Sequence, residues 1–338
     1  MKVGILGATG SVGQQLIHML DCHPTFEVTQ LFGKKSTGKK YGDVDWILPG
    51  NTPSYVEDIK ICSPSEISHD VELVFSALPP SAAESIEVEL AQKGKIVISN
   101  ASAHRMEEDI PLLIPEVNPG HLDLLRVQAK TRKWKGVLIT NPNCSTIILN
   151  LVLKPLLDAY GIEKVIAVTL QAVSGAGYPG LPSLDILGNV IPYIKGEEEK
   201  LVKETSKILG TFIDGRISPS RIEISATCTR VPTIDGHLIN GFVQTVHDVE
   251  IEEVVESLQN FSGVPQKLNL PTAPERPIRV TSKVDRPQTR FDLDPMAVVV
   301  GRIRKINNML AFTILGHNTM RGAAGASILN AELFKVVS

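Results

Sequence analysis

Cysteines, aromatic residues and long apolar runs are all scarce in this chain of 338 residues. The four cysteines, Cys22, Cys62, Cys144 and Cys228, lie far apart without C-x-x-C spacing, so the sequence predicts neither a metal site nor a disulfide framework. No apolar run approaches the roughly 18 residues of a membrane span, and the chain does not open on a signal segment. We therefore expect a cytoplasmic protein with reduced thiols and no membrane partner.

A charge excess is missing as well. The net charge of −3 gives no electrostatic reason to expect a nucleic acid as partner. A hydrophobic content of 43% and a charged content of 21% are typical of a soluble globular protein. The length suits two domains better than one core.

The chain opens on a strand, a glycine-rich turn and a helix. The apolar run 2–6 is followed by Gly-Ala-Thr-Gly-Ser-Val-Gly at 7–13, and helical spacing continues over 14–20. In this context the glycines allow backbone N–H groups to approach a pyrophosphate at the helix N-terminus. A tight turn without a ligand is the alternative, but the order of elements favours a dinucleotide site.

A basic loop follows the second predicted strand, 26–32. In dinucleotide-binding folds an Asp or Glu at this point contacts the ribose 2′-hydroxyl of NAD. Here residues 33–40 contain four lysines and two hydroxyls and no carboxylate. Lys34, Lys35 and Ser36 would supply charge-assisted donors to an additional 2′-phosphate. A solvated surface loop is the alternative, and we favour NADP.

Strands and helices alternate through the first 140 residues, with strand-like runs at 26–32, 71–77, 95–99 and 136–140 and a helical run at 82–92. Alternation predicts a parallel sheet with crossover helices. Beyond residue 163 the strand-like runs 164–172, 221–228, 238–246, 296–303 and 308–315 have fewer helices between them, which indicates an antiparallel or mixed sheet. We expect an α/β fold with a Rossmann-type NADP-binding domain (1–142), an α+β domain (143–317) and a C-terminal helix (318–338) that returns to the first domain.

Cys144 stands in Asn-Pro-Asn-Cys-Ser-Thr at 141–146, between a strand-like run and a helical run. Unpaired N–H groups and the helix dipole at a first turn favour the thiolate. A buried structural cysteine is the alternative. We favour a nucleophile with a pKa below its ordinary value.

Two segments of the second half offer partners for this thiol. Gln171 ends a predicted strand and offers an amide donor beside a reacting carbonyl. Arg230 and His237 offer a guanidinium that matches a carboxylate and an imidazole that exchanges protons. Taken singly, each is more often a packing or surface residue.

Together these motifs resemble aspartate-semialdehyde dehydrogenases, specifically the archaeal and fungal-like branch, over essentially the whole chain. The segments that carry the resemblance are 7–13, 99–105, 141–146, 171–177, 230–237 and 318–325. It implies NADPH-dependent reduction of 4-aspartyl phosphate to aspartate 4-semialdehyde and phosphate through a cysteine thioester. It also implies that the second domain carries catalysis and dimerisation, in a homodimer or homotetramer.

The resemblance also implies roles for individual residues. Cys144 would be the nucleophile, His237 the acid/base, Gln171 the residue that orients the acyl group, and Arg230 the ligand of the substrate carboxylate. Arg105, Asn143 and Lys200 would bind phosphate, and Glu198 would lie near the substrate amine, although Glu197 or Glu199 fits this short acidic run equally well. The cofactor would contact Gly7, Thr9, Gly10, Ser11, Val12, Gly13, Lys34, Lys35, Ser36, Ser76, Leu78, Ser174, Gly175 and Asn318.

Other functions stay open at this point. Malonyl-CoA or succinyl-CoA reductases of the same superfamily look similar, but they need no phosphate site and lack the Asn-Pro-Asn before the cysteine. In N-acetyl-glutamyl-phosphate reductases an aromatic residue usually follows the cysteine, where this chain has Ser145. A dinucleotide sensor without catalysis would have no reason to keep the thiol, the imidazole and the arginines.

Overall fold

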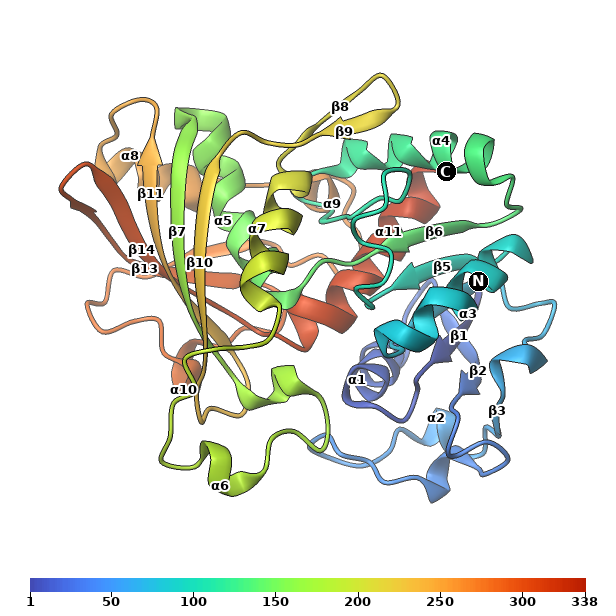
Figure 1. The fold of residues 1–338 in the computed structure, drawn as a ribbon. Helices are drawn as coiled ribbons and strands as arrows, with labels where there is room; N and C mark the ends of the chain where they lie inside the picture. Colours follow the sequence, from blue (N-terminus) through green and yellow to red (C-terminus); the bar gives the residue numbers. More distant parts are fainter.

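The computed structural model describes all 338 residues and has two lobes, each built on a six-stranded sheet (Figure 1). The first sheet is parallel throughout, in the order β3-β2-β1-β4-β5-β6. Its strands are β1 (Lys2–Leu6), β2 (Glu27–Phe32), β3 (Ile61–Cys62), β4 (Leu73–Ser76), β5 (Ile96–Ser99) and β6 (Val137–Thr140). The strand order reverses between β1 and β4, the place where parallel sheets of this kind bind ligands. The predicted Rossmann-type sheet is confirmed.

The second sheet is mixed, in the order β10-β7-β11-β14-β13-β12. Its central strands pair antiparallel, whereas the two outer pairs, β10 with β7 and β12 with β13, are parallel. Its strands are β7 (Ile162–Gln171), β10 (Glu223–Arg230), β11 (His237–Thr245), β12 (Ile278–Val280), β13 (Val298–Ile306) and β14 (Met309–Gly316). The prediction of an antiparallel or mixed second sheet is confirmed.

One long helix, α5 (Cys144–Tyr160), packs between the second sheet and the helices α7 (Glu197–Ile208) and α8 (Ile251–Gln259). Ile147, Leu151 and Leu156 of α5 are fully buried in the core that it shares with this sheet. The burial removes a continuous apolar stripe from water and holds the first residue of the helix in a fixed place.

The remaining helices cover the first sheet or lie in connections. The C-terminal helix α11 (Gly325–Val337) shares a core with the first sheet, in which Ile328 and Leu329 are fully buried beside Ile5. The other elements are α1 (Ser11–Leu20), α2 (Ser54–Glu57), α3 (Pro80–Gln92), α4 (Leu124–Arg132), α6 (Ser183–Ile186), α9 (Val264–Lys267), α10 (Thr289–Asp292) and the hairpin β8 (Thr211–Ile213) and β9 (Arg216–Ser218). None of the helices has the length and apolar character needed to cross a lipid bilayer.

The glycine-rich turn between β1 and α1 admits no side chain at two of its positions. Gly7 has a φ of +71°, and a Cβ there would lie 2.6 Å from the carbonyl oxygen of Ala77 in the next strand connection. A Cβ on Gly13 would lie 2.2 Å from the carbonyl oxygen of Gly7. The turn therefore brings backbone close to backbone, as a pyrophosphate site at a helix N-terminus requires.

Gly13→Ala should destabilise the protein by about 1–3 kcal/mol, because the added methyl group forces the turn apart. Gly120→Ala is the matched control, since a Cβ at Gly120 meets nothing within 4 Å and its φ is ordinary. Thermal and urea unfolding of both variants measure the difference. Equal stability of the two variants would contradict the close packing of the turn.

Candidate active site

Cys144 is the first residue of α5, and Asn143 caps this helix. The side-chain oxygen of Asn143 accepts hydrogen bonds from the backbone N–H groups of Ser145 (2.9 Å) and Thr146 (3.4 Å). On its other side Cys144 is tightly packed, since a Cβ on Gly322 would lie 2.5 Å from the Cys144 Cβ. The strand, turn and cap therefore fix the position of the cysteine before any ligand binds.

Helix α7 places Glu197 beside this turn. Glu197 Oε2 accepts from Asn143 Nδ2 (2.8 Å) and lies 3.5 Å from Gln171 Nε2, while Lys200 Nζ lies 3.4 Å from Glu197 Oε1. Glu198 instead accepts from the backbone N–H of Cys228 (3.0 Å). Of the glutamates that the acidic run left open, Glu197 is therefore the one that faces the cysteine turn, three residues before Lys200 on one face of the helix, whereas Glu198 contacts the backbone of β10.

Arg105 is buried against the same helix. Its NH1 donates to Glu204 Oε1 (2.9 Å) and its NH2 to the carbonyl oxygen of Asn100 (2.7 Å). The other oxygen of Glu204 accepts the backbone N–H of Asn143 (2.7 Å). The sequence analysis missed Glu204, because a glutamate inside a charged helical run is expected to face solvent. Its spacing of seven residues from Glu197 was the available signal.

Gln171, Arg230 and His237 lie at the ends of three neighbouring strands. Gln171 and Arg230 are paired in the parallel register of β7 and β10, and His237 begins the next strand, β11. Arg230 NH1 donates to the carbonyl oxygen of Ala172 (2.8 Å), and the N–H of Ala172 donates to His237 Nδ1 (3.1 Å). The structure therefore brings together these three residues, whose convergence the sequence analysis predicted.

The hydrogen bond from Ala172 determines which nitrogen of His237 carries the proton. Because Nδ1 accepts a backbone N–H, the neutral ring has its proton on Nε2. Burial, with the positive charge of Arg230, lowers the pKa of His237 to about 3, so the ring is neutral near pH 7. Its Nε2 is buried without a partner in the protein. His237 is thus arranged to donate a hydrogen bond from Nε2 to a bound molecule.

Cys144 is a neutral thiol in this state of the protein, contrary to the expectation of a lowered pKa. Protein atoms surround its sulfur although the residue keeps some exposure, and this burial, together with the charge of Glu197, raises the pKa to about 12. Ser145 N–H, Arg105 and Arg230 act in the opposite direction. They do not prevail, because burial is the largest cause and disfavours the charged thiolate.

The residues expected to bind a cofactor divide into a group that lines or adjoins one cavity and a group that lies outside its lining. Ser11 and Ser174 line one cavity of about 660 Å³ with His317, which the sequence analysis did not single out. Asn318 connects the loops around this cavity, donating to Ser174 Oγ (2.7 Å) and accepting from Gly236 N–H (2.9 Å). The rest of the set lies outside that lining: Gly7, Thr9, Gly10, Val12 and Gly13 in the turn after β1, Lys34, Lys35 and Ser36 after β2, Ser76 and Leu78 at the end of β4, and Gly175 over Arg230 and His237.

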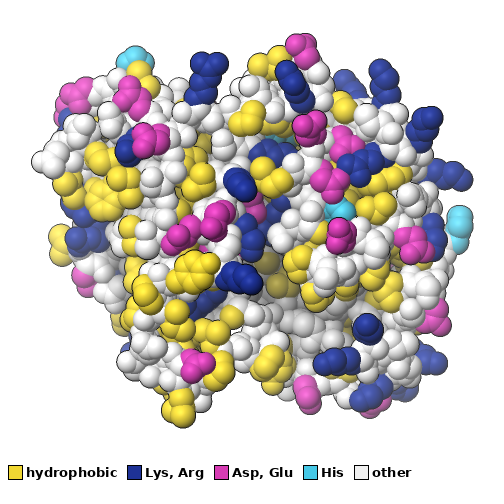
Figure 2. All heavy atoms as spheres, viewed as in Figure 1, with side chains coloured by type: hydrophobic (Ala, Val, Ile, Leu, Met, Phe, Trp, Pro, Cys, Tyr) yellow, Lys and Arg dark blue, Asp and Glu magenta, His cyan; other side chains and the backbone are white.

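Figure 2 shows Lys and Arg side chains gathered along the middle of the face between the two lobes. The protein combines a parallel dinucleotide-type sheet in one lobe with a helix that starts at a cysteine in the other. This combination defines a two-domain oxidoreductase. Residues 2–125 match the family model described as semialdehyde dehydrogenase, NAD binding domain, and residues 153–321 match the model described as semialdehyde dehydrogenase, dimerisation domain. The chain belongs to the semialdehyde dehydrogenase family.

Its relatives cover the full chain. An aspartate-semialdehyde dehydrogenase of Methanothermobacter thermautotrophicus is 50% identical over 100% of this chain and 99% of the relative. A malonyl CoA reductase (NADP) of Metallosphaera sedula is 42% identical over 98% and 96%. The crystal structure of aspartate semialdehyde dehydrogenase with NADP from Candida albicans has a TM-score of 0.91 and 39% identity, over 99% of this chain and 98% of the other. The resemblance seen in the sequence is confirmed.

The rate of Cys144 alkylation by iodoacetamide in the unliganded protein should rise roughly tenfold per pH unit between about pH 7 and about pH 9, since the thiolate fraction does so below the pKa. Mass spectrometry of the Cys144 peptide measures the rate, and the exposed Cys22 in the same digest is the control. A plateau near pH 7 would show that the thiol is already ionised.

Gly175→Ala should lower kcat/KM about 100-fold without lowering thermal stability, because small displacements of reacting groups have costs of this size. A Cβ on Gly175 would lie 2.8 Å from Arg230 NH1 and 3.1 Å from His237 Nε2. Gly120→Ala is again the control. Full activity of Gly175→Ala would mean that neither side chain needs its observed position.

Proposed function

We propose that this chain is an NADP-dependent aspartate-semialdehyde dehydrogenase, which reduces 4-aspartyl phosphate to aspartate 4-semialdehyde with release of phosphate. This reaction serves amino-acid biosynthesis on the path to lysine, threonine and methionine. One observation carries the proposal: around Cys144 the structure gathers a carboxylate and guanidinium groups that match each charged group of that substrate. Full-length relatives with this name support it.

The charged groups of the site divide among those of the substrate. Arg230 suits the α-carboxylate, because a guanidinium offers two parallel donors. Glu197 suits the ammonium group, since its carboxylate contacts Asn143 and Gln171 beside the cysteine turn, whereas the carboxylate of Glu204 is occupied by Arg105 and the Asn143 backbone. Arg105, Asn143 and Lys200 remain for the phosphate.

Binding of that substrate would also change the ionisation of Cys144. In the free protein burial, and after it the negative charge of Glu197, raises the pKa of the thiol. A substrate ammonium paired with Glu197 offsets the second of these causes, while the substrate's carboxylate and phosphate offset the charges of Arg230 and Arg105. Substrate binding would therefore remove one cause of the raised pKa.

The chemistry then proceeds in two halves on Cys144. The sulfur forms a bond to the acyl carbon, the bond from that carbon to the phosphate oxygen breaks, and phosphate leaves with the electron pair. The reducing hydride is supplied by NADPH when that cofactor is bound. Gln171 holds the thioester carbonyl, and His237 Nε2–H donates to the oxygen that gains charge, an interaction worth about 3 kcal/mol in comparable sites. Once the acyl carbon has gained the hydride, the carbon–oxygen double bond re-forms, the carbon–sulfur bond breaks, and the sulfur leaves with the electron pair as a thiolate, which releases the aldehyde.

The turn at Gly7–Gly13, the basic loop at Lys34 and Lys35, and the cavity with Ser11 and Ser174 fit NADP. We assign residues 1–142 to cofactor binding, 143–317 to catalysis and dimerisation, and 318–338 to a return of the chain to the first domain. A homodimer or homotetramer is supported by the match of 153–321 to a dimerisation domain and by exposed apolar side chains such as Leu184 and Leu187. Four free cysteines suit the cytoplasm.

The purified protein should reduce NADP in the presence of aspartate 4-semialdehyde and inorganic phosphate, with arsenate able to replace phosphate. Absorbance of NADPH measures the rate, and Cys144→Ala is the inactive control. The 42% identity to a malonyl CoA reductase makes CoA thioester reduction the second candidate. Oxidation that requires CoA instead of phosphate would overturn the proposal in favour of that activity.

A further inference from the structure

Two residues of α7 bind Arg105: Glu204 accepts from its guanidinium, and Lys207 donates to its backbone carbonyl. The Glu204 side chain is 2% exposed and accepts one bond from the Arg105 guanidinium and one from the Asn143 backbone N–H. A single carboxylate therefore joins the cation of the phosphate site to the residue before Cys144. None of the roles given to the candidate catalytic residues accounts for the buried carboxylate of Glu204.

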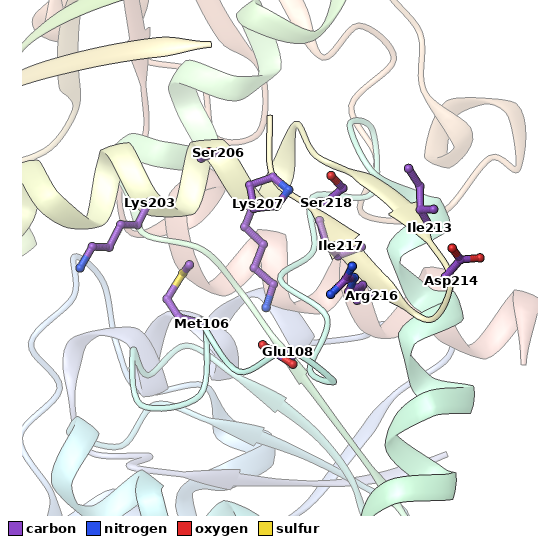
Figure 3. Close-up of a pocket in the computed structure, with 11 residues that line it drawn as sticks. Met106, Glu108, Lys203, Ser206, Lys207, Ile213, Asp214, Arg216, Ile217 and Ser218 are labelled. Atoms are coloured by element: carbon purple, nitrogen blue, oxygen red, sulfur yellow. The ribbon is translucent and has the colours of Figure 1, made fainter. Parts of the chain in front are cut away.

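Lys207 fixes the backbone of the same loop. Its Nζ donates to the carbonyl oxygens of Arg105 (2.8 Å), Glu107 (2.7 Å) and Ile110 (2.9 Å). In Figure 3 the Lys207 side chain extends from α7 toward the loop that carries Met106 and Glu108, along one wall of a pocket of about 620 Å³. An ammonium with three carbonyl partners has all its donors occupied, so this loop is fastened to α7 at three points.

The contacts of Arg105 determine how its guanidinium is presented. Glu204 and the carbonyl oxygen of Asn100 occupy one donor on each terminal nitrogen. The buried Nε has no partner in the protein. A guanidinium fixed in this way loses little freedom when it binds an anion, whereas a free arginine side chain must first be ordered.

We propose that Glu204 is a positioning residue for the phosphate site: it orients the Arg105 guanidinium and the Asn143 turn toward the leaving phosphate, with Lys207 holding the loop. The proposal rests on the proposed function, because it requires phosphate to be bound and released beside Cys144. Glu204 would act through Arg105 and the Asn143 turn rather than by contact with the substrate. The opposite role, in which Glu204 competes with phosphate for Arg105, predicts tighter phosphate binding when its charge is removed.

Glu204→Gln tests the proposal, because glutamine keeps the shape but cannot accept both bonds. In the oxidation of aspartate 4-semialdehyde, the KM for phosphate should rise about tenfold, as expected for the loss of a bond to a charged group. The KM values for semialdehyde and NADP should stay within about twofold. Glu204→Asp keeps the charge but has a shorter side chain, so its KM for phosphate should lie between those of the wild type and Glu204→Gln. Glu252→Gln removes an exposed carboxylate of α8 and should leave all three KM values unchanged.

A double-mutant cycle separates positioning from general structural damage. In an Arg105→Ala background, Glu204→Gln should raise the phosphate KM clearly less than in the wild-type background, because the part of its effect that passes through Arg105 is absent. An equal rise in both backgrounds, a uniform rise of all KM values, or a lower phosphate KM would each overturn the proposal.

A second measurement works without turnover. Inorganic phosphate should slow alkylation of Cys144 in the wild-type protein, and about tenfold more phosphate should be needed in Glu204→Gln. Protection at equal phosphate concentrations would overturn the positioning role. If phosphate protects the wild-type thiol but only CoA supports oxidation, the proposed function fails while the role of Glu204 is still tested by this shift.

Discussion

The hydrogen bonds of Asn143 determine the geometry of the site. Its side-chain oxygen caps α5, its amide nitrogen donates to Glu197, and its backbone N–H donates to Glu204. One residue therefore joins the end of the first sheet, the start of the helix that carries Cys144, and the charged face of α7. Without these bonds the cysteine and the charged side chains around it would have no fixed relation to one another.

The second feature of the site is its buried charged side chains, each of which has a partner inside the protein. Arg105 pairs with Glu204, Arg230 donates to a backbone carbonyl, and Glu197 accepts from Asn143 and approaches Lys200. Burying these charges costs free energy. The site can use them because the charged groups of a substrate can replace their partners in the protein. The neutral Cys144 thiol fits this account, since one cause of its raised pKa, the charge of Glu197, can be compensated by a ligand.

Much of this arrangement could be predicted from the sequence, and the rest depends on contacts that no local pattern reveals. The glycine turn and the strand 2–6 follow from local rules, and β1 has these bounds. The position of Cys144 at a helix start was predicted in the same way. Which glutamate of the run 197–199 faces the cysteine turn was left open, because adjacent residues of a helix point about 100° apart and a shift of one residue changes the glutamate that points inward. The backbone partner of His237 left no signal in the sequence, and the buried Glu204 left only its seven-residue spacing from Glu197, since both depend on tertiary packing.

The sulfur of Cys144 is the atom that carries the acyl group between the two half-reactions. Mixing the protein with aspartate 4-semialdehyde and NADP in the absence of phosphate tests this most directly, with NADPH absorbance followed in time and the Cys144 peptide analysed by mass spectrometry. The account predicts a burst of NADPH stoichiometric with active sites, an aspartyl group on Cys144, and its loss when phosphate is added. No burst, or an aspartyl group on any other residue, would contradict it.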